Sequence, residues 1–383
     1  MILMNRSYHR CWARNVIGSL LLAVVIVILI NPAVFVQLKN ILLKQQEEIQ
    51  VSSVEINHRV VCCRSPDYFL DLCGRLNCTS TCSADLSQLS IRVLEPSEHS
   101  RDSNDRAFFL ETSGRDDLNY RQACTVESLA FMNPNLTVNV LFMGGNVNSN
   151  SALLDKLKEK YRNIHLVGVH LDDYIAGTQL ERWYYCNNWR QGPYHVSHLS
   201  DGLRFLTLAK YGGYYFDLDV IAVRPVTDYR NFVAAESDYE FGSGAIHSDY
   251  KHPLMEMALQ DFVANYRSDI WGHNGPVLLK RVLKNWCNVG DIQSMDRVRC
   301  RGFSALPKTM FCPVHFEDVD EFFYHRMANE SIKPIWITDQ VIGVHTWNKL
   351  SIDKPIYKNS TQIYTWLAKN HCPQIFSIAP DVF

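Results

Sequence analysis

Residues 107–169 have the sequence AFFLETSGRDDLNYRQACTVESLAFMNPNLTVNVLFMGGNVNSNSALLDKLKEKYRNIHLVGV. Three short apolar runs alternate here with two longer segments whose apolar residues recur at helical spacing, the first ending before Pro134. In chain order we expect a strand at 107–111, a helix at 119–132, a strand at 137–143, a helix at 151–161 and a strand at 164–169. This alternation predicts a parallel sheet covered by helices, so the fold class is α/β.

The second half of the chain gives a more mixed pattern. Gly212-Gly213 stops one helix, and Pro253 and Pro276 each open another. The expected elements are helices at 200–211, 253–266 and 276–286 and a strand at 214–223. Together with the first half they predict one α/β domain of catalytic size, residues 106–383.

Composition excludes two classes of protein. Of the 383 residues, 47% are hydrophobic and 20% charged, which allows a sizeable packed core and excludes global disorder. Lys and Arg number 38 against 40 Asp and Glu, a net charge of -2. A protein that binds nucleic acid by neutralising phosphates would show a basic excess, so we expect no nucleic-acid partner.

The N-terminal region predicts a membrane anchor. Three arginines and no acidic residue precede an apolar run at 16–36, whose 21 residues can cross a hydrocarbon core of about 30 Å as a helix. The alternative is a cleaved signal peptide with 16–30 as its apolar region, which is long for that role. We therefore expect a single-pass type II protein, with a cytoplasmic tail at 1–15, a signal-anchor at 16–36 and a luminal stem at 37–105.

Cysteines and sequons also place the body of the protein in an oxidising lumen. Eleven of the 12 cysteines follow the anchor, and disulfides are favoured over zinc because the cluster at 62–82 has no CxxC pair. Eleven is odd, so at least one is free or bonded to another chain, which leaves a disulfide-linked or non-covalent homo-oligomer open. Four sequons predict glycosylation at Asn77, Asn135, Asn329 and Asn359.

Residues 200–225, SDGLRFLTLAKYGGYYFDLDVIAVRP, contain the candidate chemistry. Asp217 and Asp219 lie two positions apart, and on an extended backbone they would project from one face. Their neighbours are apolar, and desolvating two carboxylates is costly unless a positive charge compensates. Convergent carboxylates suit a hard divalent cation, so we expect Mn²⁺ or Mg²⁺ here.

Asp201 and Arg204 lie one helical turn apart, on the side of their helix opposite Leu199, Leu203 and Leu206. One interpretation is a helix-surface ion pair contributing a few tenths of a kcal/mol, which helical periodicity by itself favours. The other is a charged pair directed at a polar ligand beside the metal. In either case we expect truncation of these side chains to spare the core.

This stretch resembles the S-D-x-x-R … G-G-x-Y-x-D-x-D signature of retaining sugar transferases with an A-type glycosyltransferase fold. It is most similar to the α1,4-glycosyltransferase family of galactosyl- and N-acetylglucosaminyltransferases. The resemblance spans about 108–351, over several blocks in the family's order. These blocks are FFLETS at 108–113, CTVES at 124–128, WGHNGP at 271–276 and VHTWNK at 344–349.

The resemblance implies roles for individual residues. Asp217 and Asp219 would be the catalytic carboxylates, with Asp219 the main metal ligand and Asp217 near the ribose and metal-bound water. His345 would add a third metal ligand, although it also fits a core pair with Trp347 at a strand end. The implied donor-binding residues are Asp201, Arg204, Asn274, Gly275 and Trp347. Gly242-Ser243-Gly244 replaces the Asn-Gly pair that relatives often have at the donor sugar, which leaves the hexose open.

The activity implied is retaining α1,4-transfer of galactose or N-acetylgalactosamine from a UDP-sugar to a glycan acceptor, a glycosphingolipid, in the Golgi membrane. UDP-N-acetylglucosamine is a third donor that the motifs allow. One rival is an aspartyl phosphatase using Asp217, although that motif would normally end the first strand of its domain. The second rival is a non-catalytic sugar-nucleotide-binding membrane protein.

Overall fold

The computed structural model describes residues 105–327 and 333–383. The predicted tail, anchor and nearly all of the predicted stem lie outside these residues, as do the sequons at Asn77 and Asn329. Within the described part of the chain, no helix is both long enough and apolar enough to cross a membrane. The other two sequon residues, Asn135 and Asn359, are both exposed, as glycosylation requires.

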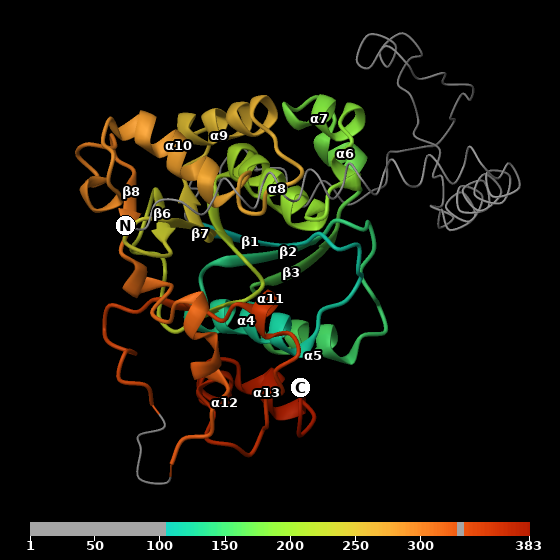
Figure 1. The fold of residues 1–383 in the computed structure, drawn as a ribbon. Helices are drawn as coiled ribbons and strands as arrows, with labels where there is room; N and C mark the ends of the chain where they lie inside the picture. The colour runs from blue at the N-terminus through green and yellow to red at the C-terminus, as the bar shows by residue number, and fades with distance from the viewer. Residues whose placement is uncertain (1–104, 328–332) are drawn as a thin grey trace, which may run out of the picture. The chain divides into compact units, whose positions relative to one another are not determined.

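A seven-stranded sheet forms the centre of the domain, in the order β3-β2-β1-β4-β7-β6-β8 (Figure 1). β1, β2, β3 and β4 are parallel, and β7 alone among the seven runs antiparallel to its neighbours, β4 and β6. The strands are β1 Arg106–Glu111, β2 Thr137–Phe142, β3 Ile164–Gly168, β4 Gly213–Phe216, β6 Phe232–Ala235, β7 Phe241–Ser248 and β8 Ser304–Leu306. The predicted α/β class with a mixed second half is confirmed.

Helices cover both faces of this sheet. Figure 1 shows α8, α9 and α10 above the strands and α4, α5, α12 and α13 below them. Alternate residues of β1 face the two layers, since Phe108 packs with the upper core and Phe109 with the lower. The α-helices of more than one turn are α4 Tyr120–Met132, α5 Ala152–Lys160, α6 Leu171–Ile175, α7 Leu180–Cys186, α8 His195–Tyr211, α9 Pro253–Ala264, α10 Pro276–Cys287, α12 Ile363–His371 and α13 Pro373–Ile378.

The first two helices of the described residues begin where their N-cap residues predict. Asn119 caps α4 in a reciprocal capping box with Gln122, and Ser151 accepts a hydrogen bond from the Leu154 N–H to cap α5. Both predicted helices and the three predicted strands of residues 107–169 are therefore confirmed within one or two residues.

Two elements of the second half differ from expectation. α8 begins at His195, five positions before the predicted helix at 200–211. The predicted strand at 214–223 is two strands, β4 and β5 (Val220–Ala222), separated by a turn that contains both aspartates. β5 leaves the main sheet and pairs antiparallel with β9 (Gly343–His345), and this exchange of partner bends the chain.

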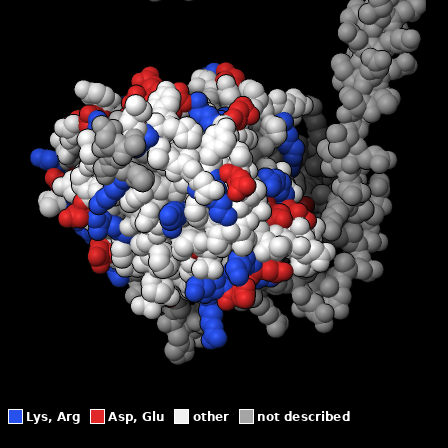
Figure 2. Space-filling view, turned by 90° about the horizontal axis from the view of Figure 1, so that it is seen from below, with Lys and Arg blue, Asp and Glu red and all other residues white. Residues whose placement is uncertain are grey.

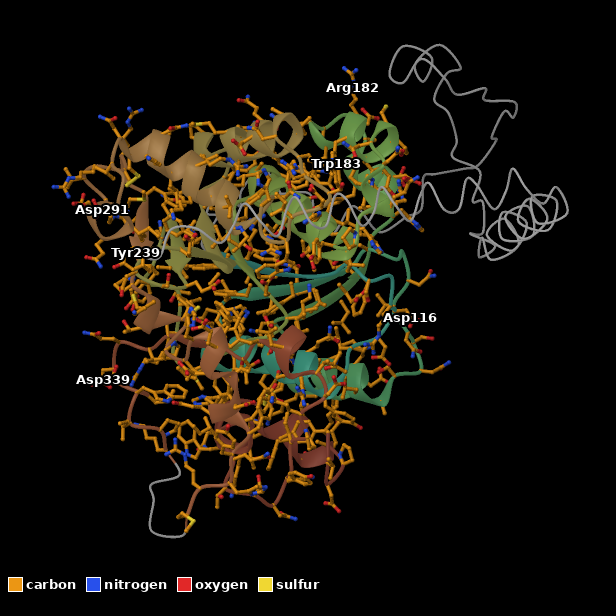
Figure 3. The ribbon with its side chains drawn as sticks, in the orientation of Figure 1. Asp116, Arg182, Trp183, Tyr239, Asp291 and Asp339 are labelled. Carbon is orange, nitrogen blue, oxygen red and sulfur yellow. A yellow bond between two sulfur atoms is a disulfide. The ribbon has the colours of Figure 1, made fainter. Side chains whose placement is uncertain are left out.

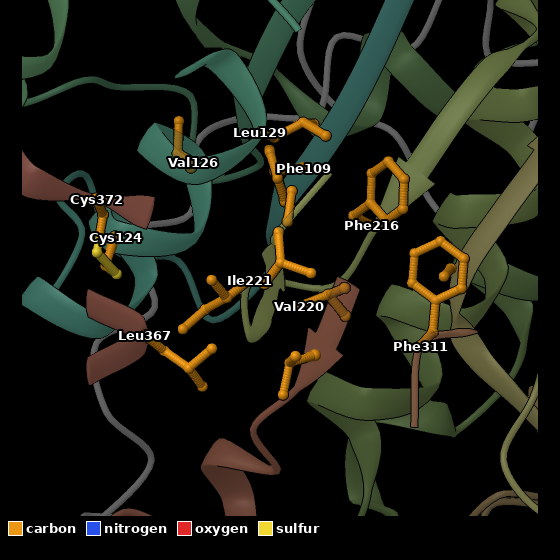
Figure 4. Packing of buried hydrophobic residues seen from close by; sticks show 14 of the residues in the cluster. Phe109, Cys124, Val126, Leu129, Phe216, Val220, Ile221, Phe311, Leu367 and Cys372 are labelled. Atoms are coloured by element: carbon orange, nitrogen blue, oxygen red, sulfur yellow. A yellow bond between two sulfur atoms is a disulfide. The ribbon is translucent and has the colours of Figure 1, made fainter. Parts of the chain in front are cut away.

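α4 joins the start of the domain to its C-terminal helices. A disulfide links Cys124 of α4 to Cys372, 248 positions later (Figure 4). The Glu127 carboxylate accepts hydrogen bonds from the Gln374 N–H at 2.8 Å and the Ile375 N–H at 2.7 Å, which satisfies the first turn of α13. Both contacts hold α13 beneath the sheet.

The remaining cysteines match the expectation of an odd count. Cys287 and Cys300 form a second disulfide, and Cys186 is also disulfide-bonded. Cys312 is free and buried, in agreement with the expectation that at least one cysteine is free or bonded to another chain. On the face seen from below, Lys and Arg side chains alternate with Asp and Glu, so neither sign forms a continuous field there (Figure 2).

Acid should destabilise the domain through His371. Burial, aided by Arg224, lowers the pKa of His371 to about 4, and neither ring nitrogen has a hydrogen-bond partner among residues 105–327 and 333–383. The unfolded chain takes up this proton near its ordinary pKa of 6.5, so stability present above that pH is lost as pH falls toward 4. We expect His371→Phe to flatten the dependence of denaturant midpoint on pH between 7 and 4, and an unchanged slope would contradict this.

Candidate active site

Three potential metal ligands converge where the chain leaves the main sheet. Asp217 follows β4, Asp219 precedes β5, and the pairing of Val220 with His345 brings the end of β9 beside them. One ligand atom from each of Asp217, Asp219 and His345 lies within 4.8 Å of the others. The aspartates converge because of a turn, rather than through the extended backbone expected from sequence.

Asp219 is the most tightly held of the three. Its Oδ1 lies 3.1 Å from Nε2 of His345, and its Oδ2 accepts a hydrogen bond from the Asn348 N–H at 3.0 Å. Burial opposes ionisation of Asp219, but His345 and the Asn348 N–H outweigh it and lower the pKa of this carboxyl. The same pair raises the pKa of His345, against the effect of burial.

This donor set fits a divalent cation. Two carboxylates and one imidazole are ligands that Mn²⁺ accepts, and Mg²⁺ takes the oxygens. In the structure His345 supplies the positive charge beside Asp219, which is the charge that a bound cation would supply instead, since a ligating histidine is neutral. The side chains are 27%, 17% and 12% exposed for Asp217, Asp219 and His345, so they are reachable but largely desolvated.

Asp201 and Arg204 form an ion pair that is buried. Arg204 Nη2 lies 3.2 Å from Asp201 Oδ1, and the side chains are 5% and 7% exposed. Residues on every side of α8 are buried at this point, so the interpretation as a helix-surface ion pair, and the expectation that truncations spare the core, are wrong. The leucine pattern missed this because the second face of α8 packs against the site rather than facing water.

Arg204 connects Asp201 to the metal-site aspartate. Its Nη1 lies 3.3 Å from Asp217 Oδ1 and donates to the Ser243 carbonyl at 2.6 Å and hydroxyl at 2.8 Å. Its guanidinium also lies 4.7 Å from the centre of the Tyr215 ring. Burial opposes the charge of Arg204, but Asp217, Tyr215 and Asp201 outweigh it and raise its pKa, so it stays cationic.

For Asp201, in contrast to Arg204, burial outweighs the neighbouring opposite charge and determines the direction of the pKa shift. Desolvation, with a smaller contribution from Asp217, raises the pKa of Asp201 to about 6 in spite of Arg204. A carboxylate held at such a value is poised to accept hydrogen bonds from a ligand's hydroxyl groups, which would offset its desolvation.

Two glycines allow the backbone to approach these carboxylates. A Cβ on Gly275 would overlap the Asp201 carboxylate, with Oδ2 at 2.8 Å and Oδ1 closer still. A Cβ on Gly244 would lie 2.8 Å from Asp217 Oδ2. Gly275 is therefore in contact with Asp201, and both residues are predicted to bind the donor.

We expect Gly275→Ala to displace the Asp201 carboxylate and to reduce sugar transfer by at least about tenfold, or 1.4 kcal/mol in the transition state. Gly290→Ala is the matched control, because a Cβ there would meet nothing within 4 Å. The measurement is kcat/KM for both variants beside their melting temperatures. Equal activity of the two variants would contradict this role for Gly275.

Asn274 and Trp347 occupy supporting positions. The buried amide of Asn274 bonds both ways to the backbone of Arg267, at 3.0 and 2.7 Å, and so closes the loop before α10. Trp347 packs on His345, with ring centres 3.8 Å apart, and donates its indole N–H to the Val314 carbonyl. Its contact with a donor stays a prediction, and the core pairing with His345 is present.

The backbone at Trp347 has a consequence for the metal site. Its φ of 54° is in the left-handed region, which a bulky side chain rarely adopts. This conformation starts α11 (Asn348–Ser351) and directs the Asn348 N–H at Asp219. Sequence reasoning gave no role to Asn348 or Tyr215, since neither has a local signal. The Tyr215 hydroxyl donates to Asp217 Oδ1 at 2.5 Å. Ser243 was expected near the donor sugar, but its contact with Arg204 was not.

Comparisons with known proteins agree with this arrangement. A glycosyltransferase sugar-binding region containing the DXD motif matches residues 120–239, which include both aspartates. The chain is thus a glycosyltransferase. An α1,4-glycosyltransferase conserved region matches residues 247–379, which include His345. With the relative of 34% identity described below, this match shows that the chain belongs to the α1,4-glycosyltransferase family.

One curated relative carries the assignment to the family, and a second is similar over the same share of the chain. Lactosylceramide 4-alpha-galactosyltransferase of Mus musculus is 34% identical over 273 residues, covering 70% of this chain and 74% of the mouse protein. Alpha-1,4-N-acetylglucosaminyltransferase of Homo sapiens is 29% identical over 285 residues, covering 70% and 78%. The solved galactosyltransferase LgtC, with donor and acceptor sugar analogs, is 14% identical, covers 72% of this chain and 96% of its own, and has a TM-score of 0.39.

Family membership excludes the phosphatase rival. The order of the strands also argues against a phosphatase. Asp217 follows the fourth strand of the domain in sequence, whereas the phosphatase motif would normally follow the first.

Proposed function

We propose that the protein is a retaining α1,4-glycosyltransferase that moves galactose or N-acetylgalactosamine from a UDP-sugar to a glycosphingolipid acceptor. The observation that carries this is the junction of two charged groups of residues: the metal-ligand set Asp217, Asp219 and His345, and the buried pair Asp201–Arg204, joined by Arg204. The names of both relatives support the linkage, and the lactosylceramide in the galactosyltransferase's name supports the acceptor class.

Asp217, Asp219 and His345 would hold Mn²⁺ or Mg²⁺. When bound, such a cation offsets the negative charge that develops on the diphosphate as the sugar leaves. Around this position the chain supplies fixed groups: the Asn348 N–H orients Asp219, and Arg204 with Tyr215 orients Asp217. These contacts hold the carboxylates in place before any ligand arrives, which lowers the cost of reorganisation during the reaction.

Asp201 and Arg204 would grip the donor hexose. Asp201 accepts hydrogen bonds from sugar hydroxyls, and Gly275 leaves it room to do so. Retention then follows from front-face attack. The acceptor oxygen bonds to the anomeric carbon as the bond to the UDP oxygen breaks, and the acceptor's proton passes to a donor phosphate oxygen. Ser243 lies in the Gly242-Ser243-Gly244 run that stands in place of the Asn-Gly pair of many relatives, and it touches Arg204. We propose that it tunes the choice of hexose.

A donor screen tests this function. The full-length chain in detergent is given UDP-galactose, UDP-N-acetylgalactosamine or UDP-N-acetylglucosamine with an alkyl β-lactoside and Mn²⁺. We expect UDP release with one of the first two donors and an α1,4-linked product by NMR. Binding of UDP without turnover of any donor would favour the non-catalytic alternative instead.

We also propose a single-pass type II protein of the Golgi membrane with its catalytic domain in the lumen. The arginines before the apolar run at 16–36 and the disulfides of the domain support this. Digestion of the C-terminus by protease in sealed microsomes, without detergent, would contradict it.

A further inference from the structure

Three side chains from distant parts of the chain meet near the candidate active site. Tyr194 precedes α8, Trp271 lies in the loop between α9 and α10, and Lys349 belongs to α11. Lys349 Nζ lies 5.4 Å from the centre of the Tyr194 ring and 5.5 Å from that of Trp271. We call these three residues the rim cluster.

The rim cluster is attached to both halves of the site. Lys349 follows Asn348, whose N–H binds Asp219. Trp271 lies four positions before Gly275, which is in contact with Asp201. The cluster is therefore linked to the metal ligands through one residue and to the donor-gripping pair through one short loop.

The loop that carries Trp271 is rigidly held. His198 is fully buried in α8, and its Nε2 lies 3.2 Å from the Ile270 carbonyl while its Nδ1 lies 3.3 Å from the Tyr266 hydroxyl. Asn274 closes the same loop on the Arg267 backbone. Trp271 is nonetheless 54% exposed, so a large apolar ring is held in water by a fixed backbone.

Packing alone does not account for this arrangement. An exposed cation–π contact contributes only about 0.5–1 kcal/mol, and an indole buried in the core would stabilise the fold more. Rigid, exposed tryptophan with a polar group beside it is typical of a binding surface, because it offers contact area at low cost in conformational entropy.

The place of the rim cluster next to the site suits one class of ligand, the sugar acceptor. In retaining transfer the attacking oxygen must come within about 3–3.5 Å of the anomeric carbon, so the groups that hold the acceptor lie within about one sugar ring of the donor. A hexopyranose has one face of C–H groups, suited to an indole face, and a rim of hydroxyls, suited to the three donors of an ammonium.

We propose that Tyr194, Trp271 and Lys349 form the acceptor platform, on which the terminal hexose of the acceptor stacks. This rests on the proposed function, since it names the acceptor subsite of the same site. Trp271 supplies the stacking face, Tyr194 and Trp271 position Lys349, and Lys349 donates to the hydroxyls of the sugar.

The test compares acceptor and donor binding in one set of full-length variants. The unaltered chain with UDP and Mn²⁺ is titrated with an alkyl β-lactoside by calorimetry, and transfer kinetics are measured in parallel. We expect Trp271→Ala to weaken lactoside binding and raise acceptor KM at least about tenfold, with UDP affinity and donor hydrolysis unchanged. Trp271→Phe should recover most of the loss, because the aromatic face returns.

Tyr239→Ala is the control. Tyr239 is an aromatic residue that is 77% exposed and lies at the edge of the domain away from α11 (Figure 3), so its removal should change neither lactoside binding nor acceptor KM.

The outcomes separate the platform from the proposed function. Lactoside binding that depends on Trp271 without any turnover would keep the platform and refute the transferase activity. Normal lactoside binding and normal acceptor KM in Trp271→Ala would overturn the platform while leaving the transferase activity intact. The platform would also be overturned if the unaltered chain transfers sugar but does not bind lactoside. For Lys349→Met we expect acceptor KM to rise at least about threefold. A matching loss of UDP affinity would assign Lys349 to the donor diphosphate and overturn its place in the platform.

Discussion

Asp219→Asn should reduce sugar transfer by at least about 1,000-fold, or 4 kcal/mol, because it removes the ligand charge that both His345 and a divalent cation need. Asparagine keeps the size of the side chain, so its oxygen can still accept the Asn348 N–H. Alanine is a poorer choice, since it would leave that partly buried donor without its carboxylate partner and so add a loss of stability of up to about 1–3 kcal/mol. The measurement is kcat/KM, with Mn²⁺-dependent UDP binding by calorimetry.

Asp339→Asn is the control for this variant. Asp339 pairs with Arg224 at 2.7 Å, but its side chain is fully exposed and lies on the lower left of Figure 3. An exposed pair of this kind contributes at most about 1 kcal/mol, and transfer should be unaffected. Metal-assisted chemistry would be refuted by undiminished transfer in Asp219→Asn, or by undiminished transfer of the unaltered chain in excess chelator.

Asp201→Asn should separate activity from stability. We expect a loss of at least about 100-fold in kcat/KM, or 2.7 kcal/mol, because the variant can no longer accept the sugar's hydroxyls as a carboxylate. UDP affinity should change little, since Asp201 is proposed to touch the hexose only. The pKa of Asp201 is about 6 in the folded state and 3.8 in the unfolded chain. Stability that the protonated group contributes below pH 3.8 is therefore lost as the pH rises through 6, so ionised Asp201 destabilises the fold at pH 7. The neutral variant should therefore melt no lower than the unaltered chain at pH 7.

Asp155 offers a matched comparison. Its ion pair with Lys158 has the same i,i+3 spacing at 3.0 Å, but both side chains are half exposed on α5. Asp155→Asn should cost a few tenths of a kcal/mol and no activity. If Asp201→Asn lowers UDP affinity as much as transfer, α8 positions the whole nucleotide. If it behaves as Asp155→Asn does, Asp201 has no part in transfer.

Local signals account for the parts of the fold that the sequence predicts well. Asn119 and Ser151 mark their helices because capping involves only neighbours in sequence, and the apolar runs at 107–111 and 137–143 mark buried strands by composition. The split of 214–223 into two strands has no such signal. It depends on β9, more than 120 residues later, which pairs with β5 in place of the main sheet.

In the candidate site, too, some residues have a signal in the local sequence and others depend on distant parts of the chain. Asp217 and Asp219 are visible as a motif, and the family resemblance supplies His345. The burial of Asp201 could not be predicted, because it depends on Gly275 and on the elements that pack over α8. Ser243 and Asn348 act through hydrogen bonds to residues 39 and 129 positions away, which only the folded chain brings together.

The disulfide between Cys124 and Cys372 can form only late in synthesis of the chain. After Cys124 is made, 248 further positions must be added before its partner exists. At about 5–20 residues per second, this leaves the Cys124 thiol unpaired for roughly ten to fifty seconds, while neighbouring parts of the domain can already fold. During that interval the underside of α4 has neither its covalent tie nor the C-terminal helices that cover it. Thiol-disulfide exchange and chaperone protection of the nascent chain should therefore govern the yield of active protein more than the intrinsic folding rate of the β1–α4–β2 unit.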